Sequence, residues 1–298
     1  MKIKYIITII LPLTLLSCQN GNLFNDDTVS EESIENSPNF DLQNKKSQEI
    51  IKEIEDKQLM LKTKLKKAKR KDVDKLYDEY SKLLNTLIQQ LDTYENNSLT
   101  EYNKWENHIT PDSIKKKMEL YDKLQIKIIE NNDGSYNLKY VPGFYYEMFK
   151  TKASHGLRDY LKIATSQRKE PIVVNGTITQ DWSEISDRLI VWENYLKKYP
   201  NTAYKINAKE KYLELIQLYL FGNKITPSYS IEIKKIEPVI EQEYMNTIKK
   251  YGKTTTGILT KSFLDYFYTN DKNFDSNEFN KKIKEYTKLE IEKEMKKF

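Results

Sequence analysis

Cysteine, histidine, glycine and proline are all scarce in this chain of 298 residues. It has one cysteine, two histidines, and eight residues each of glycine and proline. A single thiol excludes an intramolecular disulfide, and the widely separated His108 and His155 do not predict a zinc site. Few helix breakers among many Lys, Glu, Leu and Ile residues favour a helical fold.

Several motifs that identify enzymes are also missing. The sequence has no GxSxG nucleophile elbow, no HExxH motif and no glycine-rich phosphate loop, so no catalytic residue, metal or cofactor is predicted. We expect local structural roles for both histidines. Asp181-Trp182-Ser183-Glu184 has the pattern of a capping box at a helix start. Glu184 and Asp187, close to Trp182, could form a carboxylate pair, but capping and surface roles are the expected ones.

The first seventeen residues predict a secretion signal. Lys2 and Lys4 precede an apolar run from Tyr5 to Leu16. This run is shorter than the ~20 residues that a membrane span needs. A charged start followed by a short apolar core is typical of a cleaved signal peptide, which we assign to residues 1–17.

The signal ends in Leu15-Leu16-Ser17-Cys18, which resembles the lipobox of bacterial lipoproteins. The resemblance implies that the thiol of Cys18 carries diacylglycerol, with palmitate among its acyl chains, and that a peptidase cuts before it. Cys18 would then anchor the protein to a membrane, because each buried methylene contributes ~0.8 kcal/mol. No later apolar run is long enough to span a bilayer.

Residues 18–43 form an acidic segment after this cysteine. From Tyr5 to Asn44 there is no Lys or Arg, and six acidic residues lie in that stretch. We expect a lipidated N-terminus followed by a disordered linker. Acidic residues after the cysteine also resemble the surface-export signals of Bacteroidota lipoproteins. The expected location is the outer membrane, on its periplasmic or its surface side.

Periodicity predicts a mainly α fold, a helical bundle or irregular helical array with one or two small β-hairpins. Residues 44–125 are the N-terminal helical hairpin region, with paired helices over 44–95. Residues 99–125 suggest another helix, for which Thr110-Pro111 marks a start near Asp112. Residues 126–298 are the mainly helical C-terminal region. Within it, residues 126–140 alternate around Asp-Gly and predict a hairpin. Residues 171–178, around Asn-Gly, predict a second small hairpin or an ordered loop.

The pattern of residues 185–221 predicts two helices joined by Tyr199-Pro200-Asn201, and the second helix is expected to end at Gly222. This pair resembles one helix hairpin of tetratricopeptide-like envelope lipoproteins. No second copy follows at a period near 34 residues, so no solenoid is predicted. The wider stretch 133–227 resembles uncharacterised bacterial lipoproteins, and this resemblance does not indicate any particular activity.

One basic run stands out between the first two predicted helices. Seven cations and no acid lie within ten residues: Lys62, Lys64, Lys66, Lys67, Lys69, Arg70 and Lys71. They could contact anionic lipid headgroups, lipopolysaccharide or a wall polymer. The alternative is a solvated helix face beside a turn. Nucleic acid is not an expected partner of an exported, tethered protein.

These observations predict a non-enzymatic binding or assembly module in the bacterial cell envelope. Its partners would be the membrane, through Cys18, and an envelope protein or an anionic polymer. Two alternatives stay open. One is a carboxylate-dependent hydrolase of cell wall or glycan, and the other is a surface-exposed lipoprotein that binds a host component or a polymer.

Overall fold

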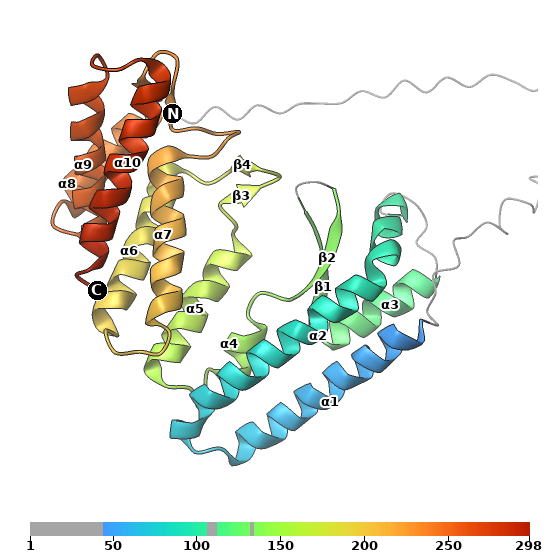
Figure 1. Ribbon diagram of the computed structural model, residues 1–298. Coiled ribbons are helices and arrows are strands. Elements are labelled where there is room, and N and C mark those ends of the chain that lie inside the picture. The colour runs from blue at the N-terminus through green and yellow to red at the C-terminus, as the bar shows by residue number, and fades with distance from the viewer. Residues whose placement is uncertain (1–43, 106–111, 132–133) are drawn as a thin grey trace, which may run out of the picture. The chain divides into compact units, whose positions relative to one another are not determined.

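The computed structural model describes residues 44–105, 112–131 and 134–298, and within them the fold is mainly α, as predicted (Figure 1). Ten helices and three two-stranded antiparallel sheets make up the described part. In that part, no helix combines the length and the apolar character that crossing a bilayer requires.

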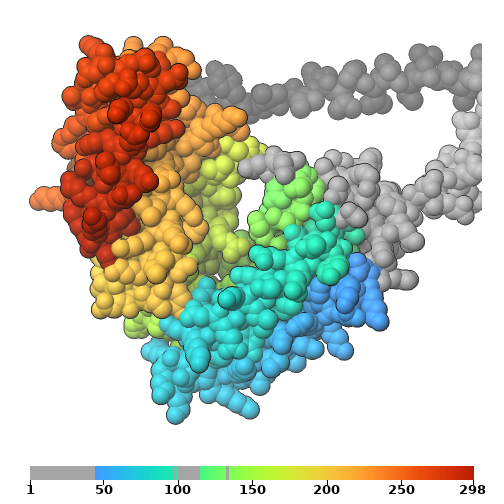
Figure 2. Space-filling model, viewed as in Figure 1, coloured from blue at the N-terminus to red at the C-terminus, as the bar shows by residue number. Residues whose placement is uncertain are grey.

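The predicted N-terminal hairpin is present as α1 (Lys45–Lys67) and α2 (Arg70–Trp105), which lie side by side (Figure 2). Asn44 caps α1, since its side chain accepts the backbone N–H groups of Lys46 and Ser47. The apolar stripe of α1 has a seven-residue gap between Ile54 and Leu61. Gln58 fills this gap; it is buried and donates its Nε2 to the Leu124 carbonyl at 2.9 Å.

One predicted boundary in this region is wrong, and the next one is confirmed. α2 does not end at residue 95 but continues to Trp105, because Leu91, Glu95 and Leu99 prolong its buried face. The next helix, α3 (Asp112–Lys123), starts at Asp112, as the Thr110-Pro111 pair predicted.

Both predicted β-hairpins are confirmed. β1 (Ile126–Glu130) pairs antiparallel with β2 (Tyr136–Tyr140), and the alternating Tyr136, Leu138 and Tyr140 are buried. β3 (Val173–Val174) and β4 (Thr177–Ile178) flank a two-residue turn. Asn175 and Gly176 both have positive φ, +48° and +77°, which such a tight hairpin turn requires.

A third small hairpin was not predicted. β5 (Tyr229–Ser230) pairs with β6 (Lys235–Ile236) in a stretch expected to be helical from residue 230. Two-residue strands carry too little alternation to be recognised on their own, and no Asn-Gly or Asp-Gly pair marks the turn here, unlike the turn between β3 and β4. In the structure, Tyr229 and Ile236 lie opposite each other in this hairpin, and both side chains are buried.

The remaining helices follow the predicted order. They are α4 (Phe144–Phe149), α5 (His155–Lys169), α6 (Trp182–Lys198), α7 (Lys205–Phe221), α8 (Pro238–Tyr251), α9 (Thr255–Asn270) and α10 (Ser276–Met295). α7 ends at Gly222 as expected, with φ of +65°. The expected capping box of α6 is not formed, since Asp181 holds the N-cap position without a side-chain hydrogen bond.

Buried side chains form two clusters. The first joins α1 and α2 to the β1–β2 hairpin, α4 and the first half of α5, and continues past residue 126 to Leu161. The second lies among α6 to α10 and contains the aromatic residues Phe263 and Phe267. Tyr160 packs against both clusters and stacks on Tyr204 at 5.5 Å between ring centroids.

Tyrosine, present 22 times, supplies much of this core. Burial raises the pKa of Tyr229 to about 12 and that of Tyr195 to about 12. Both hydroxyls serve as hydrogen-bond donors. Tyr229 donates to Asn280 at 2.7 Å, and Tyr195 donates to the Gly156 carbonyl at 3.0 Å.

Candidate anion-binding groove

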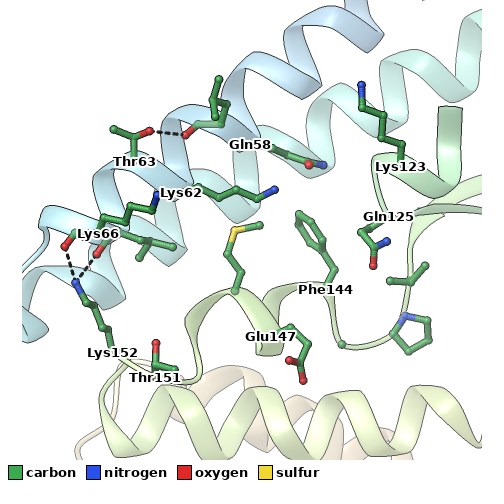
Figure 3. Close-up of a pocket in the computed structure, with 16 residues that line it drawn as sticks. Gln58, Lys62, Thr63, Lys66, Lys123, Gln125, Phe144, Glu147, Thr151 and Lys152 are labelled. Carbon is green, nitrogen blue, oxygen red and sulfur yellow. Dashed lines mark hydrogen bonds between the residues drawn. The ribbon is translucent and has the colours of Figure 1, made fainter.

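A groove of about 610 Å³ lies between α1 and α4, a volume within the usual range for ligand sites. The α3–β1 and β2–α4 turns border one end of it, and Lys152 lies near the C-terminus of α1 at the other (Figure 3). We call it the α1–α4 groove. Its apolar lining consists of Leu59, Leu65, Val141, Pro142, Phe144 and Met148, and its lysines are Lys62, Lys66, Lys123 and Lys152.

The apolar floor is built by residues from distant parts of the chain. Phe144 begins α4 and stacks on Tyr140 with ring centroids 4.1 Å apart. Gly143, before it, has φ of +99°, so a side chain here would strain the turn. On the α1 side, Leu59 is 63% exposed at the edge of the groove. Apolar surface left open here is available to a ligand.

Two of the four lysines in the groove already have partners. Lys152 donates its Nζ to the carbonyls of Leu65 and Lys66 at 2.7 and 2.8 Å, which satisfies the last turn of α1. Lys123 pairs with Glu55 at 2.8 Å and holds the pKa of that carboxyl below its usual range.

Lys62 and Lys66 are the uncompensated cations of the groove. Both side chains are exposed, and in the described part of the chain no carboxylate lies within ion-pairing distance of either. Figure 3 shows Lys62 and Phe144 pointing toward one another from opposite walls. The groove thus places positive charge above an apolar floor.

Glu147 is the one carboxylate among the lining residues. It forms an ion pair with Lys150 on its own side of the groove and raises the pKa of that lysine. Figure 3 shows its side chain directed away from α1. The carboxylate therefore does not neutralise Lys62 or Lys66.

The structure separates the seven cations of the predicted basic run. Lys62 and Lys66 line the groove, whereas Lys64 lies over the Tyr80 ring at 4.9 Å and 3.9 Å from Glu79. The Tyr80 hydroxyl raises the pKa of Lys64. The others are exposed around the α1–α2 turn and do not line the groove: Lys67, Lys69, Arg70 and Lys71.

The sequence did not indicate Lys123, Lys152, Phe144 or Met148 as site residues. They lie roughly 60 to 90 positions from Lys62, and no local pattern links them to it. Lys152 lies beside the C-terminal end of α1 in space but far from it in the chain. Its contact with that helix end can therefore be recognised only in the tertiary structure.

The other candidate residues take structural or surface positions where they are described. Asp187 accepts hydrogen bonds from Lys250 and Tyr251, at 3.1 and 2.7 Å, and is exposed. Glu184 is exposed on the same helix, and His155 is the exposed first residue of α5. Cys18 and His108 lie outside the described residues.

Metal binding finds no support in the geometry of residues 44–105, 112–131 and 134–298. Among these residues, no three His, Cys, Asp or Glu side chains are grouped so that they could hold an ion.

Comparison with known proteins returned no relative. No family model matches the chain, and no curated protein and no solved structure is significantly similar to it.

Proposed function

We propose that this protein is a membrane-anchored, non-enzymatic binding module of the bacterial cell envelope that holds an anionic ligand in the α1–α4 groove. The observation that carries the proposal is the pair Lys62 and Lys66, unpaired above an apolar floor. A phosphate or carboxylate group placed there would form charge-assisted hydrogen bonds with both ammonium groups.

The floor adds a requirement on the ligand. Leu59, Met148 and Phe144 offer apolar surface, and covering such surface contributes about 25 cal/mol per Å². A small inorganic anion would leave this surface open to water. The ligand that fits both features carries its charge on a body with apolar faces, such as an acidic sugar or an alkyl phosphate.

The groove lysines can be tested by a double substitution. Lys62→Gln/Lys66→Gln should weaken binding of a galacturonate trimer and of decyl phosphate about tenfold, because two partly exposed charge contacts contribute roughly 0.7 kcal/mol each. Titration calorimetry at low ionic strength measures the effect, since salt screens such contacts.

The matched control is Lys69→Gln/Lys71→Gln. It removes the same charge from the same basic run, but both residues lie outside the groove. This variant should bind both probes as the unaltered protein does. Equal losses in the two variants would mean that net charge, not the groove, attracts the ligand, and no binding by the unaltered protein would contradict the proposal.

We also propose that the anchor is lipid on Cys18, on the basis of the sequence before it. Replacing it by Cys18→Ala should move the protein from the membrane fraction to the soluble fraction, because the acyl chains supply the affinity. Metabolic labelling with palmitate should mark the unaltered protein and not the variant. Membrane association that survives the substitution would refute a lipid anchor, and protease treatment of intact cells would distinguish the two sides of the membrane.

A further inference from the structure

A second basic pocket adjoins the α1–α4 groove. Gln125, Val141 and Pro142 line both cavities, so the two meet across the turn that joins β2 to α4. The second cavity has a volume of about 550 Å³. We call it the Arg168 pocket; its other lining residues are Asp122, Lys127, Arg168 and Lys169.

The cations of the Arg168 pocket come from two elements, β1 and the C-terminal turn of α5. Arg168 is held in place, since its Nη2 donates to the Tyr140 carbonyl at 3.2 Å. Lys169 is exposed at the end of α5. Asp122 is the one carboxylate of the lining, so positive charge predominates.

The strand register adds an independent sign of unbalanced charge. Lys127 on β1 lies directly across from Lys139 on β2, and both are exposed. Like charges in directly opposed positions destabilise a strand pair. Within the described residues neither lysine forms an ion pair, but the charge of Lys139 partly offsets the rise that burial causes in the pKa of Asp92. Lys127 is therefore the less compensated of the two. An anion bound beside β1 would relieve this repulsion.

We infer that the ligand is a linear polyanion whose carboxylate or phosphate groups repeat along a chain. The chain would run from Lys62 and Lys66, over Val141 and Pro142, to Lys127 and Lys169. The half-buried Val141 and Pro142 separate the two basic sites. A chain that alternates charged groups with uncharged linking units matches this succession of basic, apolar and basic surface.

This inference rests on the proposed function, because it extends the same site. A ligand that occupies both pockets gains the second contact without a second loss of translational freedom, so its affinity exceeds that for either pocket alone. A ligand confined to the α1–α4 groove gains nothing from the Arg168 pocket. Length dependence at the Arg168 pocket therefore distinguishes a polymer from a short anion.

The experiment compares a galacturonate trimer with a decamer by titration calorimetry on the protein from Cys18 onward with Cys18→Ala. Lys127→Gln/Lys169→Gln should weaken binding of the decamer at least tenfold and leave binding of the trimer unchanged. Lys224→Gln/Lys235→Gln removes the same charge from exposed positions that line neither pocket and is the control.

The outcomes distinguish the linear polyanion from a short anion, from a lipid and from the absence of any ligand. Loss of decamer binding in the Lys127 and Lys169 variant, but not in the control, supports the inference. Equal binding of trimer and decamer, with no effect of that variant, overturns the inference and leaves the proposed function standing. Binding of decyl phosphate with no binding of either galacturonate oligomer overturns it in favour of a lipid. Absence of all binding refutes the proposed function itself.

Discussion

Replacing Glu193 by alanine should lower the free energy of unfolding by about 3 kcal/mol, because a buried carboxylate then no longer satisfies the start of α9. Glu193 on α6 is 1% exposed and accepts the backbone N–H groups of Thr255 and Thr256 at 2.9 and 3.0 Å. It also accepts the Thr256 hydroxyl at 3.0 Å. Without it, these buried donors lose their partner and a cavity remains.

Urea denaturation followed by circular dichroism measures this loss. Glu184→Ala is the matched control, since it makes the same replacement at an exposed position of the same helix and should change stability by less than about 0.5 kcal/mol. Glu193→Gln keeps one acceptor oxygen and should be intermediate. If Glu193→Ala proved as stable as the control, the contact between α6 and α9 would not depend on this carboxylate.

Lys117→Met should cost about 3 kcal/mol of stability, since it leaves the buried Glu95 carboxylate without its counter-ion. Lys117 on α3 forms an ion pair with Glu95 on α2, and both side chains are almost fully buried. Burial first, and then the charge of Glu95, raise the pKa of the neighbouring Tyr121 hydroxyl. The pair therefore lies in an environment where an unpaired charge is costly.

The double variant Glu95→Met/Lys117→Met tests this reason. Removing both charges should recover stability to within about 1 kcal/mol of the unaltered protein. Lys116→Met, at an exposed position beside it, is the control. A double variant as unstable as the single one would mean that packing, not charge, sets the cost.

How far the sequence predicts the fold depends on the range of the interactions involved. The β1–β2 hairpin and the end of α7 at Gly222 follow from residues close together in the chain, and both are confirmed. The predicted end of α2 at residue 95 is wrong. Glu95 lies on the buried face of the helix because it forms an ion pair with Lys117 of another helix, and α2 continues beyond it. Gln58 is likewise a polar residue in an apolar stripe, and it is buried because its side chain donates to the distant Leu124 carbonyl.

The α1–α4 groove shows the same division. The basic run identified Lys62 and Lys66, but nothing in the run distinguishes them from Lys67 or Lys71. Their selection depends on where α4 lies, because its residues Phe144 and Met148 form the opposite wall.

The sequence by itself determined the helical class, the turns of the β1–β2 and β3–β4 hairpins, and the excess of cations near the end of α1. All three depend on composition and on patterns among residues close together in the chain. Only the tertiary structure decided which cations remain unpaired. Lys123 and Lys152 are compensated by partners far away in the chain, whereas Lys62 and Lys66 are not. The physical reason is that charge compensation and burial depend on distances in space, which sequence separation does not specify.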